Sequence, residues 1–342
     1  MIEFRYHIVS LIAVFMALAV GIVLGAGPLK EAIGTQLTGQ VEQLRKEKAT
    51  LRTDLDAANH GLDNRDKFID AAAPYLLGGL LDGRRVAIVT LDQPSSTIVG
   101  NVRDRLVQAG ATVTGEVDIE KLWTDPTQRA FRESLSGSLL TYLDPRPADD
   151  AGVDGILSEA LAQGITRRAP GSRDALADPA GLGLDLLREG KLINLPKALT
   201  IPADDIVLVV GATPVLAAGQ ADQRAAAHVT LNALIAACNR RSVGLVVAAG
   251  APDPHSLVQA IRADPNLERT IETVESIETD PSTVAVPLAL ASRITGLVGH
   301  YGFASDDTAV LPQRVALSPI VRTVVATGTA TGSGSSPSSS AG

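Results

Sequence analysis

The longest hydrophobic stretch of the chain lies near its N-terminus. Between residues 8 and 27, Ser10 carries the only polar side chain. At about 1.5 Å per helical residue, this stretch spans the roughly 30 Å hydrocarbon layer of a membrane. A cleaved signal peptide is the alternative, but its apolar region would be about 7 to 15 residues long, and Pro28 directly follows the Gly25-Ala26-Gly27 cleavage candidate. We therefore expect a single uncleaved anchor within residues 1–29.

Charges on either side of the anchor indicate its orientation. Arg5, His7 and the terminal amine precede it, whereas Lys30 and Glu31 cancel after it. Because positive residues tend to stay on the cytoplasmic side, we expect a cytoplasmic N-terminus and an extracytoplasmic body, with the inner membrane favoured. Membrane lipid is therefore an expected partner.

Small residues recur at every fourth position of the anchor and share one helix face. They are Ala13, Ala17, Gly21 and Gly25. Such a face lets two membrane helices approach closely, which favours a dimer. The alternative is that Gly and Ala are simply frequent in membrane helices.

Beyond Pro28 the hydrophobic spacing changes to a heptad repeat. The a positions are Val41, Lys48, Leu55 and Leu62, and the d positions are Leu37, Leu44, Leu51 and Ala58. In a parallel pair of helices, Glu47 at g faces Arg52 at the partner's following e position, and Lys48 in the seam disfavours other registers. We expect a coiled-coil stalk over residues 30–73 that forms a parallel homodimer. Because the repeat lasts only about four heptads, one amphipathic helix packed on its own domain is the alternative.

After residue 74 the pattern changes to short apolar runs separated by helical stretches. Strands are expected at 85–91, 111–117, 206–210, 243–248 and 270–277, and helices at 95–108, 221–239 and after Pro254. Continuous runs of Ile, Val and Leu are typical of parallel strands buried on both faces. The fold class is therefore α/β: an N-terminal transmembrane helix and a coiled-coil stalk, then a mostly parallel, doubly wound, Rossmann-like domain over 74–326. We also expect a helical insert around 125–190 and a disordered tail over 327–342.

Composition and charge exclude several classes of function. The net charge is −8 without a long basic run, so a nucleic-acid partner is not expected. The only cysteine is Cys238, which excludes an intrachain disulfide and a Cys-x-x-Cys pair. The sequence also lacks a Walker loop, a Gly-x-Ser-x-Gly elbow and a His-Glu-x-x-His pair. We therefore expect no enzyme, and no cofactor is evident.

Candidate ligand sites lie at the carboxyl ends of the predicted strands, where ligands of open α/β sheets bind. They are Asp92, Gly211-Ala212-Thr213 and residues 250–255. A small-molecule-sensing domain would show an open pocket near Asp92 and Gly211. The plainer interpretation is that Asp92-Gln-Pro94 and Asp253-Pro254 begin helices.

A second candidate is a glycine-rich loop late in the chain, formed by Gly299, His300, Tyr301 and Gly302 and followed by Asp306 and Asp307. Glycine lets such a loop approach a ligand or partner closely, and a packed turn is the alternative. Cys238 shares a helix face with Leu231, Leu234 and Ile235, so a buried thiol is expected. His228 and His60 do not resemble metal ligands.

Two stretches resemble a known family. They are Met1-Ile-Glu-Phe-Arg-Tyr-His7 leading into Ser10 and Val20-Gly-Ile-Val-Leu-Gly25, and the late Gly299-His-Tyr-Gly302. Both are similar to the actinobacterial copper transport protein B (MctB-like) family. The resemblance implies a role in copper homeostasis, by efflux through an outer-membrane pore of the mycobacterial envelope. A corynebacterial relative implies instead a role in cell separation and envelope assembly, with an envelope or division protein as partner.

The residues themselves give the copper role little support. Copper(I) prefers thiolate, thioether and imidazole ligands, but Met1 and Met16 lie at or inside the membrane segment and the histidines are scattered. Copper is therefore possible through the resemblance alone, at a site shared by two chains or through an indirect role. The alternative function is a dimeric scaffold or regulator of envelope assembly that neither conducts nor binds copper.

Overall fold

The computed structural model describes residues 3–26, 28–212 and 219–320. Thr213 and the expected disordered tail at 327–342 lie outside the described residues. The chain divides into two compact units, Met1–Lys67 and Phe68–Gly342, and each is considered by itself.

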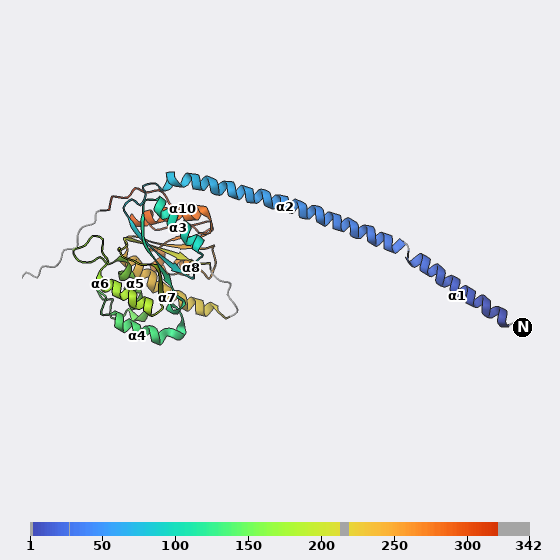
Figure 1. Cartoon of the computed structure of the whole chain (residues 1–342), viewed down its shortest axis with the longest axis horizontal. Coiled ribbons are helices and arrows are strands. Elements are labelled where there is room, and N and C mark those ends of the chain that lie inside the picture. The colour runs from blue at the N-terminus through green and yellow to red at the C-terminus, as the bar shows by residue number, and fades with distance from the viewer. Residues whose placement is uncertain (1–2, 27, 213–218, 321–342) are drawn as a thin grey trace, which may run out of the picture. The chain divides into compact units, whose positions relative to one another are not determined.

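Two long helices form the first unit, α1 (Glu3–Ala26) and most of α2 (Pro28–Leu77), which carry the blue colours of Figure 1. α1 contains a candidate membrane span at Phe4–Gly25, none of which is buried by the protein. Within the described residues, it is the one helix long and apolar enough to cross a membrane. α2 begins at Pro28 because the first turn of a helix needs no N–H donor from that position.

The second unit is built on a mostly parallel sheet, which confirms the predicted α/β class. In the described part of the chain the sheet has seven strands in the order β3-β2-β1-β4-β5-β6-β7. β1 pairs in parallel with β2 and β4, and β5, β6 and β7 continue the parallel ladder, whereas β3 is antiparallel to β2. The strands are β1 (Arg85–Leu91), β2 (Thr112–Ile119), β3 (Ile193–Lys197), β4 (Asp205–Val210), β5 (Leu245–Ala249), β6 (Glu272–Val274) and β7 (His300–Tyr301).

Helices pack against both faces of the sheet (Figure 1). α3 (Ser96–Gln108) and α10 (Asp280–Ile294) contribute to the apolar cluster on one face. The cluster on the other face includes side chains from α4 (Arg129–Leu139), α5 (Gly152–Thr166), α6 (Asp178–Glu189), α7 (Ala221–Arg241), α8 (Leu257–Ala263) and α9 (Pro265–Glu268). Two short 3-10 helices, η1 (Lys121–Trp123) and η2 (Pro126–Gln128), follow β2.

β4 shows why its sequence is apolar at successive positions. All six of its residues are buried. Ile206 and Leu208 belong to the apolar cluster of one face, whereas Val207 and Val209 belong to that of the other. Because successive side chains of a strand point to opposite faces, a strand covered on both sides favours apolar residues on each face, as the five positions after Asp205 have.

Two edge strands differ from the prediction. β3 follows the helical insert expected around 125–190, in a stretch where no strand was predicted. Its Pro196 and exposed residues conceal it, since proline is restricted to sheet edges. β7 replaces the central part of the expected loop at residues 299–302: His300 and Tyr301 pair with Thr273 and Val274 of β6. A two-residue strand between glycines lacks the run of β-forming residues on which strand prediction depends.

Candidate functional site

The glycines of the motif Gly299, His300, Tyr301 and Gly302, called here the GHYG motif, make room for neighbouring side chains. A Cβ atom on Gly299 would lie 2.5 Å from the Tyr301 hydroxyl oxygen. A Cβ atom on Gly302 would lie 2.6 Å from an Asp307 carboxylate oxygen. Tyr301 is buried. The two glycines are therefore explained by close packing at this end of the sheet.

His300 is tied to the neighbouring strand. Its Nδ1 lies 2.8 Å from Thr273 Oγ1, and its backbone N–H donates to Thr308 Oγ1 at 3.0 Å. Burial lowers the pKa of His300, and the nearby Arg262 guanidinium lowers it further. These contacts favour a neutral, fixed imidazole.

Arg262 of α8 gathers three carboxylates beside β7. Its guanidinium contacts Glu275 at 2.9 Å, Asp306 at 3.2 Å and Asp307 at 2.5 Å. Asp307 also accepts the backbone N–H of Ala304 at 2.7 Å. Burial raises the pKa of Glu275, and the Arg262 charge opposes that rise. The network ties the segment after β7 to α8, so the predicted Asp306 and Asp307 take part in an ion network.

Glu272 is a fully buried acid on β6. Burial raises its pKa to about 8, against smaller opposing effects from the hydroxyls of Tyr301 and Ser292 and from Arg293. An isolated carboxylate is costly to bury, so the protonated form is the stable one below about pH 8.

The soft copper ligands remain apart. Cys238 is buried in α7, and burial raises the pKa of its thiol to about 12. His228 is also buried on α7, His60 is exposed on α2, and Met16 is exposed on α1. Among the described residues, no group of three His, Cys, Asp or Glu side chains is suited to hold a metal ion. The buried thiol expected at Cys238 is confirmed.

The residues predicted for self-association are exposed in the single chain. Ala13, Ala17, Gly21 and Gly25 lie on α1, and the heptad positions lie on α2. The large apolar side chains of the heptad seam range from 40% exposed at Val41 to 68% exposed at Leu51.

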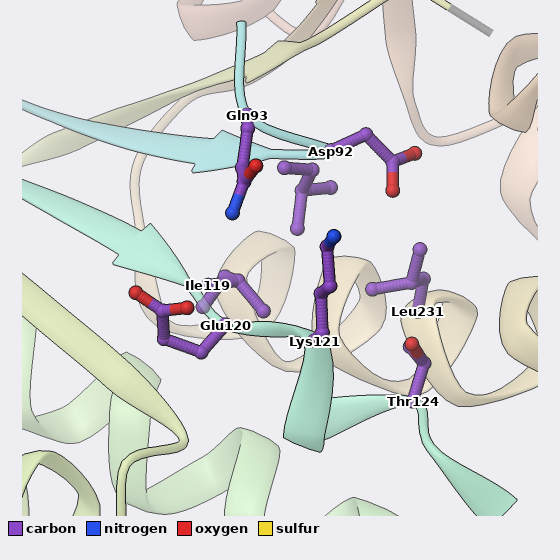
Figure 2. A pocket seen from close by; sticks show the side chains of 8 residues that line it. Asp92, Gln93, Ile119, Glu120, Lys121, Thr124 and Leu231 are labelled. Atoms are coloured by element: carbon purple, nitrogen blue, oxygen red, sulfur yellow. The ribbon is translucent and has the colours of Figure 1, made fainter. Parts of the chain in front are cut away.

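The carboxyl ends of β1 and β2 form an open cleft (Figure 2). A cavity of about 240 Å³ is lined by Leu91, Asp92, Gln93, Ile119, Glu120, Lys121, Thr124 and Leu231. Asp92 and Gln93 are both in the left-handed region, with φ of 55° and 52°. A Cβ on Gly211 would lie 2.4 Å from the Asp92 carbonyl oxygen. The structure thus brings the predicted Asp92 and Gly211 together.

The helix expected at 95–108 is confirmed as α3, whereas the cap predicted at Asp253 is wrong. Ser95 caps α3, since its Oγ accepts the N–H of Ile98 at 3.3 Å. Ser256 caps α8, while Asp253 accepts the N–H of His255 at 2.7 Å in the turn before it. Aspartate side chains also stabilise turns in this way, which is why the Asp-Pro pattern predicted the cap at the wrong residue.

Lys121 and Arg224 are cleft residues that the sequence analysis missed. Lys121 begins η1 two residues after β2, and Arg224 lies near the start of α7 beside a second cavity that also contacts Lys121. Their position in the sequence could have indicated them. Both follow a strand, and ligands of open α/β sheets bind at the carboxyl ends of the strands.

Comparison with known proteins identifies the family. Residues 1–312 match the family described as "Copper transport outer membrane protein, MctB". The chain belongs to this family.

Curated members of the MctB family are similar to most of the chain. "Copper transporter MctB" of Mycobacterium tuberculosis (strain ATCC 25618 / H37Rv) is 29% identical over 311 residues, which cover 88% of this chain and 96% of the relative. "Copper transporter MctB" of Mycobacterium leprae (strain TN) is 28% identical over 323 residues, which cover 92% of this chain and 100% of the relative. The MctB match includes α1, α2 and the sheet through β7. The family description names transport and no catalytic activity.

Proposed function

We propose that the chain is a membrane-anchored envelope protein that supports copper tolerance by copper efflux. The supporting observation is its similarity over 311 residues to proteins curated as copper transporters. α1 supplies the anchor. Arg5 and His7 before the span favour a cytoplasmic N-terminus, with the α/β domain outside the cytoplasmic membrane.

The proposed active form is a parallel dimer joined through α2 and supported by the small-residue face of α1. The seam of α2 is apolar and exposed in the single chain, and burial of such side chains against a second copy is favourable. Glu47 and Arg52 supply opposite charges at g and e positions in the parallel register. Together these features favour a second copy as the partner.

We propose that any direct copper site is formed by the assembly rather than by one chain. Within the described residues, α1 is the one candidate span, and the possible soft ligands lie apart. A direct role would therefore use ligands shared between copies or with an envelope partner. His300 is the soft ligand at the outer edge of the sheet, where such sharing would be possible.

A second candidate is a dimeric scaffold or regulator of envelope assembly and cell separation. The pKa of Cys238, raised to about 12 by burial, favours it, because copper(I) binds the thiolate form. A scaffold needs a long exposed stalk and a partner surface but no metal ligand.

Anaerobic copper(I) competition titration of the full-length protein in detergent separates these functions. A direct copper role requires tight, stoichiometric binding that is weakened in His300→Ala and unchanged in Cys238→Ser. Binding no stronger than that of buffer would exclude direct coordination and favour the scaffold.

A further inference from the structure

The cleft beside β1 and β2 extends into a second cavity. The 240 Å³ cavity and a neighbouring cavity of about 360 Å³ share Asp92, Lys121, Thr124 and Leu231. Arg224 and His228 of α7 line the second one. Volumes of this order suit a small metabolite rather than a macromolecule.

The cleft borders the end of β1, the strand beside which the strand order reverses. β1 pairs with β2 on one side and β4 on the other, and the chain reaches β4 only after completing β2 and β3. Ligands of open α/β sheets bind at such a point. Asp92 and Gln93 adopt left-handed backbone there although neither is glycine, and such strain concentrates at functional sites.

Two cations face this cleft without a partner. The side chains of Lys121 and Arg224 form no ion pair or hydrogen bond with any described residue. They come from different elements, η1 and α7, but line the same cavity. A phosphate group between them would accept charge-assisted hydrogen bonds from both.

Acceptor groups lie beside the cations. Figure 2 shows the Lys121 amine between Asp92 and Glu120, whose carboxylates point to opposite sides. The Gln93 amide lines the same cavity. Asp125, which lines the second cavity, already accepts the backbone N–H and the hydroxyl of Thr127. Free carboxylates and amides match hydroxyl donors, so a bare anion would leave these groups unused.

We propose that this cleft binds a small hydroxylated phosphate of the sugar-phosphate class. Lys121 and Arg224 hold the phosphate, and Asp92, Glu120 and Gln93 accept or donate hydrogen bonds to the hydroxyl groups. This inference is independent of the proposed copper function.

Trp123 provides a local reporter for the test. It is the only tryptophan of the chain, and it is buried in η1, two residues after Lys121. Full-length protein in detergent is titrated with glucose 6-phosphate, ribose 5-phosphate and glycerol 3-phosphate. Trp123 emission and the midpoint of thermal unfolding are recorded. Glucose, which has hydroxyl groups but no phosphate, and inorganic phosphate, which has no sugar hydroxyl groups, test each feature by itself.

At least one of the three phosphates is expected to give a saturable change in emission and a raised midpoint. Its apparent Kd is expected to increase by about tenfold in Lys121→Gln and in Arg224→Gln, the loss of one charge-assisted hydrogen bond. The matched control is Arg269→Gln, which removes an exposed arginine outside the cleft, and its Kd is expected to equal that of the parent.

Three results would overturn the proposal. The first is the absence of saturable change with all three phosphates. The second is equal binding by the parent and both cleft variants when circular dichroism shows that all are folded. The third is inorganic phosphate binding as tightly as the sugar phosphates, which would show that the hydroxyl groups are not recognised.

Discussion

At the scale of single residues, the chemistry of this chain depends on burial. Cys238 and Glu272 are both fully buried, and in each the pKa shifts toward the neutral form. The GHYG motif follows the same logic, since its glycines allow Tyr301 and Asp307 to pack closely. Residues that draw attention in the sequence are thus explained by packing, Cys238 in α7 and the GHYG motif at β7.

Glu272 is expected to make stability pH-dependent. Its pKa is about 8 in the folded protein against 4.5 for the unperturbed group, so the folded state holds one more proton between these values. This contribution is complete below pH 4.5 and is lost as pH rises to about 8, at no more than about 1.4 kcal/mol per pH unit. Chemical unfolding followed by Trp123 emission at pH 5 and pH 8 measures it.

Glu272→Gln removes this dependence because glutamine does not titrate. The variant is expected to gain stability relative to the parent as pH rises from 5 to 8. Glu189→Gln, at an exposed position, serves as the control and is expected to follow the parent. A constant difference between Glu272→Gln and the parent across this range would contradict the neutral buried acid.

Gly299→Ala tests the packing explanation of the GHYG motif. The new Cβ would lie 2.5 Å from the Tyr301 hydroxyl oxygen, so we expect a loss of about 1–3 kcal/mol in the free energy of unfolding. Gly100→Ala in α3 meets no atom within 4 Å and is expected to be neutral or stabilising by up to about 1 kcal/mol. Equal effects of the two substitutions in urea titrations would refute the packing role.

Cys238 is expected to be unreactive in the folded protein. Because burial holds the thiol neutral and shielded, a maleimide should label it at pH 7.5 only after denaturant is added. Mass spectrometry over time measures the labelled fraction. Rapid stoichiometric labelling of the folded chain would show that the site opens and that the thiol is available to copper.

At the scale of elements, α2 carries a row of exposed apolar side chains at the heptad positions, the seam of the proposed dimer. Leu51→Asp places a charge in this row and is expected to convert the proposed dimer to monomer at micromolar concentration. Thr53→Asp adds the same charge two residues away, outside the a and d positions, and should leave the dimer intact. Light scattering of full-length protein in detergent distinguishes the two masses, and an unchanged dimer in Leu51→Asp would contradict the seam.

The sequence predicts the central elements far better than the edges. β1 occupies the expected residues 85–91 because its continuous apolar run is buried on both faces. β3 contains Pro196 and exposed residues, and β7 has only two residues, so neither has a pattern that distinguishes it from a loop. Strand order was also beyond reach, since it depends on contacts between distant segments.

The candidate site is only partly predictable for the same reason. Asp92 and Gly211 each follow a strand, and the carboxyl ends of parallel strands lie at one edge of the sheet, so their proximity could be predicted. Arg224 joins Lys121 at the cleft only because the fold brings α7 to the cavities beside the ends of β1 and β2. That juxtaposition requires the folded chain, and no local pattern of Lys and Arg indicates it.

At the scale of the whole molecule, family membership supports the function, whereas the structure supports the proposed arrangement of the chain. The MctB match covers residues 1–312 and supports a copper-related function. The described residues supply one candidate membrane helix, a row of exposed apolar side chains on α2 and a cleft without a cluster of metal ligands. The proposed function joins these observations by assigning copper handling to the dimer and its envelope partners.

Cell-associated copper is the measurement that tests this account most directly. A strain lacking the gene is grown in raised copper, and its copper content is measured by mass spectrometry after complementation with the parent, Leu51→Asp or Thr53→Asp. We expect the deletion to accumulate copper, and the parent and Thr53→Asp to restore the normal content, whereas Leu51→Asp should not restore it despite equal membrane abundance. Copper content and growth indistinguishable from those of the undeleted strain would contradict a role in copper efflux.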